Sequence, residues 1–269
     1  MKRIQLYHIA YSDQTVAEMP EGYFLLDNRQ DNRHDWREYW PIRTFLLSGE
    51  LDPDTWYGFF SPKFASKTGL SHQGVVDFIH AAPADTDVFT FSPQPDMGSL
   101  FLNVFEQNEL FDPGFTAAAD AYLASLRHPR LPGSVGVLVM DSRQVVFSNF
   151  IVAKPAFWKA WLALTEPMFA LCEGPDSALK AALVHATTYT GAVERKVFMI
   201  ERMASLLLTI EPHWRVKAYD TFRCAWSATR LGEQKLEAVI SDALKVAMRE
   251  IGHPEYTAAF SQLRARLNR

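Results

Sequence analysis

The amino-acid sequence predicts an α/β protein with a mostly helical C-terminal portion. Three observations lead to this prediction. Short β-rich runs alternate with helical segments up to residue 155, and most of the 15 prolines lie in that part of the chain. From residue 156 onward, apolar residues recur at the spacing of one helical face. Strands that alternate with helices and lead into a helical tail are typical of a sheet covered by helices.

Six apolar runs in the first part of the chain are predicted as strands, because turn residues or prolines end most of them. The first, Arg3–Ala10, turns away at Tyr11-Ser12-Asp13. The run 135–140 (VGVLVM) is bounded by Gly133 and Asp141 and is expected to be a buried strand. The remaining runs cover residues 23–26, 56–60, 88–91 and 145–153.

Two helices are predicted between these strands, over residues 35–47 and 74–80. Asp35 is a candidate cap of the first helix, with Glu38 at the capping-box position. Pro41 lies inside this segment, and a start at residue 41 is the alternative.

The C-terminal portion shows three helical stripes, over residues 157–171, 193–210 and 236–251. Pro212 ends the second stripe and Gly252 caps the third. We therefore expect an α/β core over residues 1–155 and a helical portion over residues 156–269 that packs on it in one compact unit.

Composition limits the classes of function. The chain has 269 residues, 48% of them apolar, which is ample for a buried core. Its net charge of −4 gives no general attraction to nucleic acid. Cys172 and Cys224 are too far apart for a Cys-x-x-Cys metal site, and so few cysteines favour the reducing cytoplasm. No signal peptide or membrane span is expected. Motifs for phosphate-loop nucleotidases, Rossmann dehydrogenases, α/β-hydrolases and zincin proteases are missing from the sequence.

Two acidic positions are candidates for a divalent metal. Asp85-Thr86-Asp87 has the spacing that lets two carboxylates hold Mg²⁺ or Mn²⁺, with Asp87 nearest the apolar run 88–91. A solvated turn is the alternative for this triplet. Asp141 follows the predicted strand 135–140, where ligands collect in open α/β sheets. A strand-end turn is its alternative.

Polar residues for an anionic ligand follow two other predicted strands. Asp27 and Asn28 come after residues 23–26 and are candidates for a nucleoside, or form an Asx turn. In the aromatic segment 56–67, Ser61 precedes Lys63 and Lys67, whose i,i+4 spacing on a helix brings both ammonium groups to one anion. The alternative is a core strand with an exposed turn.

Four stretches resemble bacterial glycosyltransferases of capsule and lipopolysaccharide assembly. They are residues 35–47 (DWREYWPIRTFLL), 56–64 (WYGFFSPKF), 147–158 (FSNFIVAKPAFW) and 195–208 (RKVFMIERMASLLL). Their order agrees with the family over most of residues 3–210. The family's His-Tyr-Arg-Arg stretch is replaced here by Phe60-Ser61-Pro62-Lys63, in which Lys63 lacks the bidentate fork of arginine.

The resemblance implies a GT-A-like nucleotide-binding sheet and transfer of a sugar from a nucleotide-activated donor to a saccharide or lipid-linked saccharide acceptor. Asp27, Asn28, Ser61, Lys63 and Lys67 would bind the donor, with Mn²⁺ or Mg²⁺ on Asp87 or Asp141. The aromatics and the amide expected to orient the sugars are Trp36, Trp40, Tyr57 and Asn149. Glu201 and Asp141 are the candidate bases.

Two alternatives remain open. One is a non-catalytic protein that binds carbohydrate or nucleotide within a polysaccharide assembly complex. The other is a metal-independent transferase with a lipid-linked donor. The expected location is the cytoplasm, with at most peripheral contact at the inner face of the membrane.

Overall fold

One mixed sheet of six strands organises the residues that the computed structural model describes, which are 2–30, 33–126, 128–189, 191 and 193–267. The strand order is β2-β1-β3-β5-β4-β6, and β5 runs antiparallel to its neighbours. This confirms the α/β prediction. The strands are β1 (Arg3–Ala10), β2 (Phe24–Asp27), β3 (Thr55–Phe60), β4 (Val88–Thr90), β5 (Ile151–Ala153) and β6 (Val216–Ala218).

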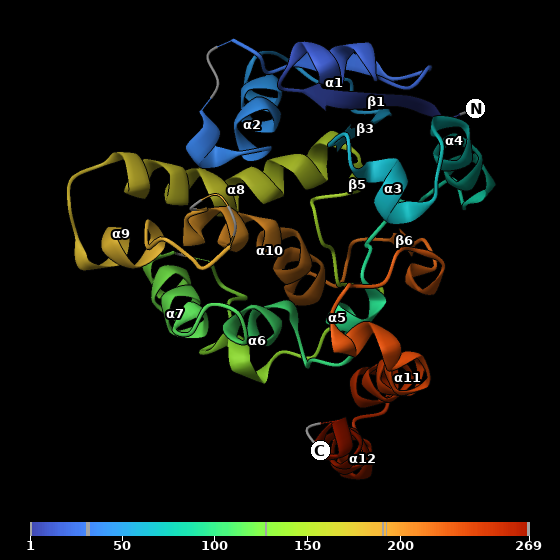
Figure 1. Ribbon diagram of the computed structural model, residues 1–269, viewed down its shortest axis with the longest axis vertical. Coiled ribbons are helices and arrows are strands. Elements are labelled where there is room, and N and C mark those ends of the chain that lie inside the picture. The colour runs from blue at the N-terminus through green and yellow to red at the C-terminus, as the bar shows by residue number, and fades with distance from the viewer. Residues whose placement is uncertain (1, 31–32, 127, 190, 192, 268–269) are drawn as a thin grey trace.

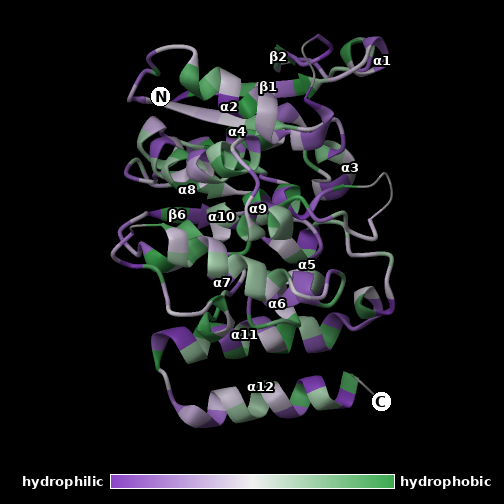
Figure 2. Cartoon of the chain, turned by 90° about the vertical axis from the view of Figure 1, so that its left-hand side faces the viewer, coloured by the Kyte–Doolittle hydropathy of each residue, from purple (hydrophilic) through white to green (hydrophobic). Residues whose placement is uncertain are grey.

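Helices make up most of the remaining described structure, and some of them pack on the two faces of this sheet. They are α1 (Asp13–Ala17), α2 (Tyr39–Leu47), α3 (Phe64–Thr68), α4 (His72–Ala81), α5 (Pro95–Ser99), α6 (Val104–Glu109), α7 (Phe115–Ser125), α8 (Pro155–Glu173), α9 (Ala178–Leu183), α10 (Arg195–Ile210), α11 (Lys235–Glu250) and α12 (Pro254–Leu267). The elements β1, α1 and α2 lie at one end of the molecule, whereas α11 and α12 lie at the other (Figures 1 and 2).

Strand β3 shows how the sequence builds the two faces. All six of its residues are buried, because successive side chains enter different cores. Tyr57 and Phe59 join the larger core, which includes α2, α8 and α10. Trp56 and Phe60 join the smaller core, formed with α3 and α4. Gly58 is required between them, since a Cβ there would lie 2.7 Å from the Val152 side chain.

Two predicted strands are wrong in whole or in part. Residues 135–140 form no strand: Val135–Val137 is a short 3-10 helix, and within the run only Val135 and Met140 are buried, whereas Val137 is 73% exposed. In the run 145–153 only Ile151–Ala153 pairs. Ser148 and Asn149 have φ values of 61° and 52°, and this left-handed backbone cannot continue a strand.

The first predicted helix also begins later than Asp35. Residues His34–Trp36 form a 3-10 helix, and Arg37, with φ of 50°, turns the chain before α2 begins at Tyr39. Pro41 therefore lies in the first turn of α2, where its missing N–H leaves no intrahelical hydrogen bond unmade. Glu38 adjoins the start of α2 rather than pairing with a cap at Asp35, and its side chain is left to face the pocket described below.

The C-terminal portion is not purely helical. Strand β6 pairs in parallel with β4, so residues after 156 complete the sheet. Helices α8 and α10 also share one core with β3 and α2. Within the described residues, no helix combines the length and the apolar composition needed to span a lipid bilayer.

Candidate functional site

A pocket of about 400 Å³ opens where three parallel strands end. Tyr11 follows β1, Asn28 follows β2 and Ser61 follows β3, and all three line the pocket. Ser148 and Asn149 precede β5, whose antiparallel direction brings its beginning to the same edge. Ligands of open α/β sheets collect at this edge, and the volume lies in the range of small-molecule sites.

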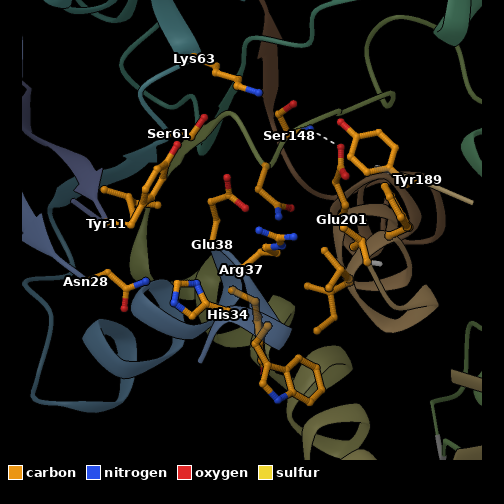
Figure 3. A pocket seen from close by; sticks show the side chains of 18 of the residues that line it. Tyr11, Asn28, His34, Arg37, Glu38, Ser61, Lys63, Ser148, Tyr189 and Glu201 are labelled. Atoms are coloured by element: carbon orange, nitrogen blue, oxygen red, sulfur yellow. Dashed lines mark hydrogen bonds between the residues drawn. The ribbon is translucent and has the colours of Figure 1, made fainter. Parts of the chain in front are cut away.

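Helical segments supply the remaining walls. The segment before α2 contributes His34, Arg37 and Glu38. Lys63 directly precedes α3, Lys67 lies in α3, and Glu201 lies in α10. Figure 3 shows Glu38 and Arg37 between Tyr11 and Asn28 on one side and Ser148, Glu201 and Tyr189 on the other. The pocket thus joins cationic and acidic side chains from separate parts of the sequence.

Backbone strain concentrates in this pocket. Among the described residues, four non-glycine residues have positive φ, and three of them line the pocket: Arg37, Ser148 and Asn149. Each such conformation costs about 1–3 kcal/mol and persists only where its surroundings enforce it. Here Glu201 Oε1 accepts a 2.5 Å hydrogen bond from the Ser148 N–H, and Lys67 Nζ donates to Ser148 Oγ at 2.8 Å. The strained turn is therefore fixed from two sides.

Several polar groups of the pocket have no protein partner. Within the described part of the chain, the side chains of Lys63, Arg37 and Glu38 make no hydrogen bond or ion pair. Asn149 is only 8% exposed, and its buried Oδ1 atom also has no hydrogen-bond partner among the described residues. A buried acceptor without a partner costs about 1–3 kcal/mol. These groups are arranged as a polar ligand would need them.

The structure brings seven of the residues predicted from the sequence to this pocket. Segments far apart in the chain carry them, and the predicted helix after Pro62 is present as α3, which is what turns Lys63 and Lys67 toward the same space. These pocket residues are Asn28, Trp36, Ser61, Lys63, Lys67, Asn149 and Glu201.

Asp27 does not line the pocket. Both of its carboxylate oxygens accept hydrogen bonds from Arg29, at 2.6–3.2 Å. These bonds lower the pKa of Asp27 to about 2. The position of this carboxylate therefore does not support its predicted role in binding the sugar donor. The alternative, an Asx turn, is present: the Arg29 N–H donates to Asp27 Oδ1 at 3.0 Å.

The three predicted sugar-binding aromatics are structural. Trp36 lines the pocket but is 0% exposed, and its Nε1 donates a hydrogen bond to Glu173. Tyr57 is 4% exposed in the main core. Trp40 packs against Phe169, with ring centroids 6.0 Å apart, away from the pocket. None of them presents a ring face to a ligand.

The predicted metal ligands are used in ion pairs elsewhere. Asp87 lies at the amino end of β4, at the opposite edge of the sheet from the pocket, and contacts Arg215 at 3.2 Å and Lys154 at 3.3 Å. Asp141 is 0% exposed and binds Arg143 and Arg249. Burial alone would raise the pKa of Asp141, but the hydrogen bonds from Arg143 and the charge of Arg249 outweigh it and hold the pKa low. Neither position fits a site for Mn²⁺ or Mg²⁺, and no group of three metal-ligating side chains occurs among the described residues.

The sequence patterns did not indicate the other residues of the pocket as site residues. Among these are Tyr11, His34, Arg37, Glu38, Ser148 and Tyr189. Position after a strand could have indicated Tyr11. For the others, the sequence carries no signal, because tertiary packing and left-handed backbone decide where they point.

Comparison of the chain with protein-family models, curated proteins and solved structures finds no match in any of the three.

Proposed function

We propose that the protein is a glycosyltransferase that moves a sugar from a nucleotide-activated donor to a saccharide of a bacterial surface polysaccharide. One observation carries the proposal. One pocket at the ends of parallel strands combines two cations, Lys63 and Arg37, with a carboxylate, Glu38, and none of the three has a side-chain hydrogen bond or ion pair among the described residues. Such a transfer needs both: cations to neutralise the departing diphosphate, and a base to accept the proton of the attacking hydroxyl.

The donor would bind along the strand ends. Lys63, directly before α3, and Lys67, within α3, would pair with the phosphates. Arg37 lines the same pocket and would add a third cation. Asn28 and Ser61, 6% and 8% exposed, would hold the nucleoside. In this proposal the protein's own cations carry the neutralisation of charge.

The acceptor would occupy the side of the pocket lined by α10. Asn149 Oδ1, the buried acceptor without a partner, would receive a sugar hydroxyl. Tyr189, which is 61% exposed, offers the aromatic ring there. A nucleotide sugar donor implies the cytoplasm, and a lipid-linked acceptor implies the inner face of the membrane.

Thermal stabilisation by UDP, GDP and their sugars, each with and without Mn²⁺, tests the donor site. A ligand at 100 times its dissociation constant adds about 2.7 kcal/mol, or roughly 5–11 °C for a chain of this size. The Lys63→Ala variant should reduce this shift by about half or more at the same ligand concentration. Lys159→Ala, which removes an exposed lysine of α8 outside the pocket, should keep it. No shift with any nucleotide would contradict the proposal.

A non-catalytic nucleotide- or carbohydrate-binding protein is the second candidate. The replacement of the family's His-Tyr-Arg-Arg stretch by Phe60-Ser61-Pro62-Lys63 favours it, since two arginines are lost. Release of nucleoside diphosphate from a bound nucleotide sugar separates the two: a transferase releases it slowly with water as the acceptor, whereas a binding protein shows the thermal shift and no release.

A further inference from the structure

The pocket contains two carboxylates, Glu201 and Glu38, in different surroundings. We infer that Glu38 is the general base of the transfer and that Glu201 is a positioning residue. This inference rests on the proposed transferase function. The predictions from sequence placed the base at Glu201 or Asp141, so Glu38 is a new assignment.

Glu201 is held by its neighbours at both oxygens. Its Oε1 accepts the Ser148 N–H at 2.5 Å, and its Oε2 lies 3.1 Å from Nη1 of Arg202. The Arg202 residue is only 4% exposed, and its other partners are the neutral oxygens of Gln107, Asn108 and Phe198. The carboxylate of Glu201 is therefore the counter-charge of a buried guanidinium, which is costly to leave uncompensated. Glu201 therefore fixes Ser148 and balances Arg202.

Asp141 is excluded as the base by its position. It does not line the pocket, and its two oxygens are bound by Arg143 and Arg249. No acceptor hydroxyl in the pocket can reach this carboxylate.

Glu38 has the opposite properties. Its carboxylate is half-buried in the pocket, with no ion pair or hydrogen bond among the described residues. Figure 3 shows it projecting into the pocket between the strand-end residues and the α10 side. The left-handed Arg37 before it, with φ of 50°, is what turns the chain so that Glu38 adjoins the first turn of α2.

Tyr11 lies in the same pocket, directly after β1. Burial is the main cause that raises the pKa of its hydroxyl, and the negative charge of Glu38 raises it further while Arg37 opposes that effect. The three side chains therefore meet within electrostatic range at the end of β1. The step that follows needs a carboxylate near a strand end, where the donor would lie.

The step balances as a single displacement. The acceptor hydroxyl oxygen attacks the anomeric carbon and forms the new glycosidic C–O bond. The bond from that carbon to the diphosphate oxygen breaks, and the nucleoside diphosphate leaves with the electron pair, facing Lys63 and Lys67. The hydroxyl proton passes to a carboxylate oxygen of Glu38. With water as the acceptor, the same step releases the free sugar.

The test measures hydrolysis of UDP-glucose, UDP-galactose and GDP-mannose by the full chain, as release of UDP or GDP. For the donor that the wild type cleaves, Glu38→Gln should lower kcat by about 10²–10⁴-fold. The KM and the thermal shift produced by that donor should stay near the wild-type values, because the glutamine keeps the size of the side chain. Glu50→Gln, an exposed residue outside the pocket, is the matched control and should leave kcat unchanged.

Azide provides a second readout that a structural role would not move. This anion attacks carbon without giving up a proton, so it should restore turnover in Glu38→Ala as a glycosyl azide, and should not restore it in Glu201→Ala. Azide rescue also identifies the base if the glutamine variant is poorly folded.

Two failures are distinguishable. If the wild type neither binds nor cleaves any of these donors, the transferase function falls and the base assignment falls with it. If the wild type cleaves a donor and Glu38→Gln keeps kcat within threefold, the function stands and the assignment of Glu38 is overturned. The same holds if Glu38→Ala is inactive and azide restores nothing.

Discussion

The two edges of the sheet carry similar side chains in different states. At the amino end of β4, Asp87 and Asp85 are joined to Arg215, and Asp87 also contacts Lys154. At the opposite edge, in the pocket, Lys63 and Glu38 have no ionic partner among the described residues. Charge alone therefore does not mark a site in this protein.

The difference lies in what each charge contacts. A paired charge is already compensated, and most of its capacity for hydrogen bonding is used. A charge that faces a pocket without a protein partner is available to a ligand. The edge near Asp87 and the interior near Asp141 have the first pattern, which is the pattern of structural ion pairs.

The largest effect is expected at Asp141. Asp141→Asn should lower the free energy of unfolding by about 3 kcal/mol, since Arg143 and Arg249 lose their shared counter-charge in a buried position. Urea unfolding measures this change. Nucleotide-induced thermal shifts should persist at temperatures where the variant is folded. A stable variant that loses a Mn²⁺-dependent shift would show instead that Asp141 binds metal.

Substitution of Lys63 should change nucleotide affinity but not stability, whereas substitution of Lys154 should change stability but not affinity, and both effects should be smaller than that at Asp141. Lys63→Ala should weaken binding of the nucleotide that stabilises the wild type by at least tenfold, with little change in Tm, because a charge-assisted hydrogen bond is worth about 1.5–3 kcal/mol. Lys154→Ala should lower stability by up to about 1 kcal/mol, through Asp87 and the Trp56 ring, and leave affinity unchanged. Calorimetric titration measures the affinity of both variants, and urea unfolding measures their stability. Equal changes in the two variants would contradict the distinction between the pocket and the ion pairs near Asp87.

The smallest effect is expected in the pH dependence of stability. Burial raises the pKa of Asp87, but the hydrogen bonds from Arg215 and Lys154 outweigh it and keep the pKa below its usual value. The stabilisation is therefore complete above about pH 5 and is lost as the pH falls through the lowered pKa. Asp87→Asn should therefore reduce the loss in the free energy of unfolding between pH 5 and pH 2, by less than about 1 kcal/mol. A curve unchanged between pH 5 and 2 would contradict this.

Residues 3–10 and 235–251 show what the sequence pattern could predict. In both, one period of apolar residues is carried through the element and a turn residue ends it, so β1 has the predicted bounds and α11 nearly so. Residues 135–140 are apolar without a period that separates two faces, and such a run does not by itself distinguish a strand from other structure; here only Val135 and Met140 are buried. The strand end expected before Asp141 is absent for this reason.

The candidate site divides in the same way. Asn28, Ser61 and Lys63 follow strands whose ends are visible in the sequence, so their gathering at one edge could be predicted. Glu38 could not, because its direction depends on the left-handed backbone of Arg37, which no sequence rule requires of an arginine. Trp36 was misassigned because composition does not distinguish a ring in the core from one exposed to a ligand.

The pairing of β4 with β6 has a consequence for synthesis of the chain. Val88–Thr90 leaves the ribosome long before its partner Val216–Ala218, and the intervening 125 residues take roughly 6–25 s to translate. Throughout that interval one edge of β4 has no strand to bond, and Phe89 lacks the cover that it has in the finished fold. The nascent chain therefore passes through a period in which an apolar strand edge is open to other chains, and chaperone binding at this stage would protect it.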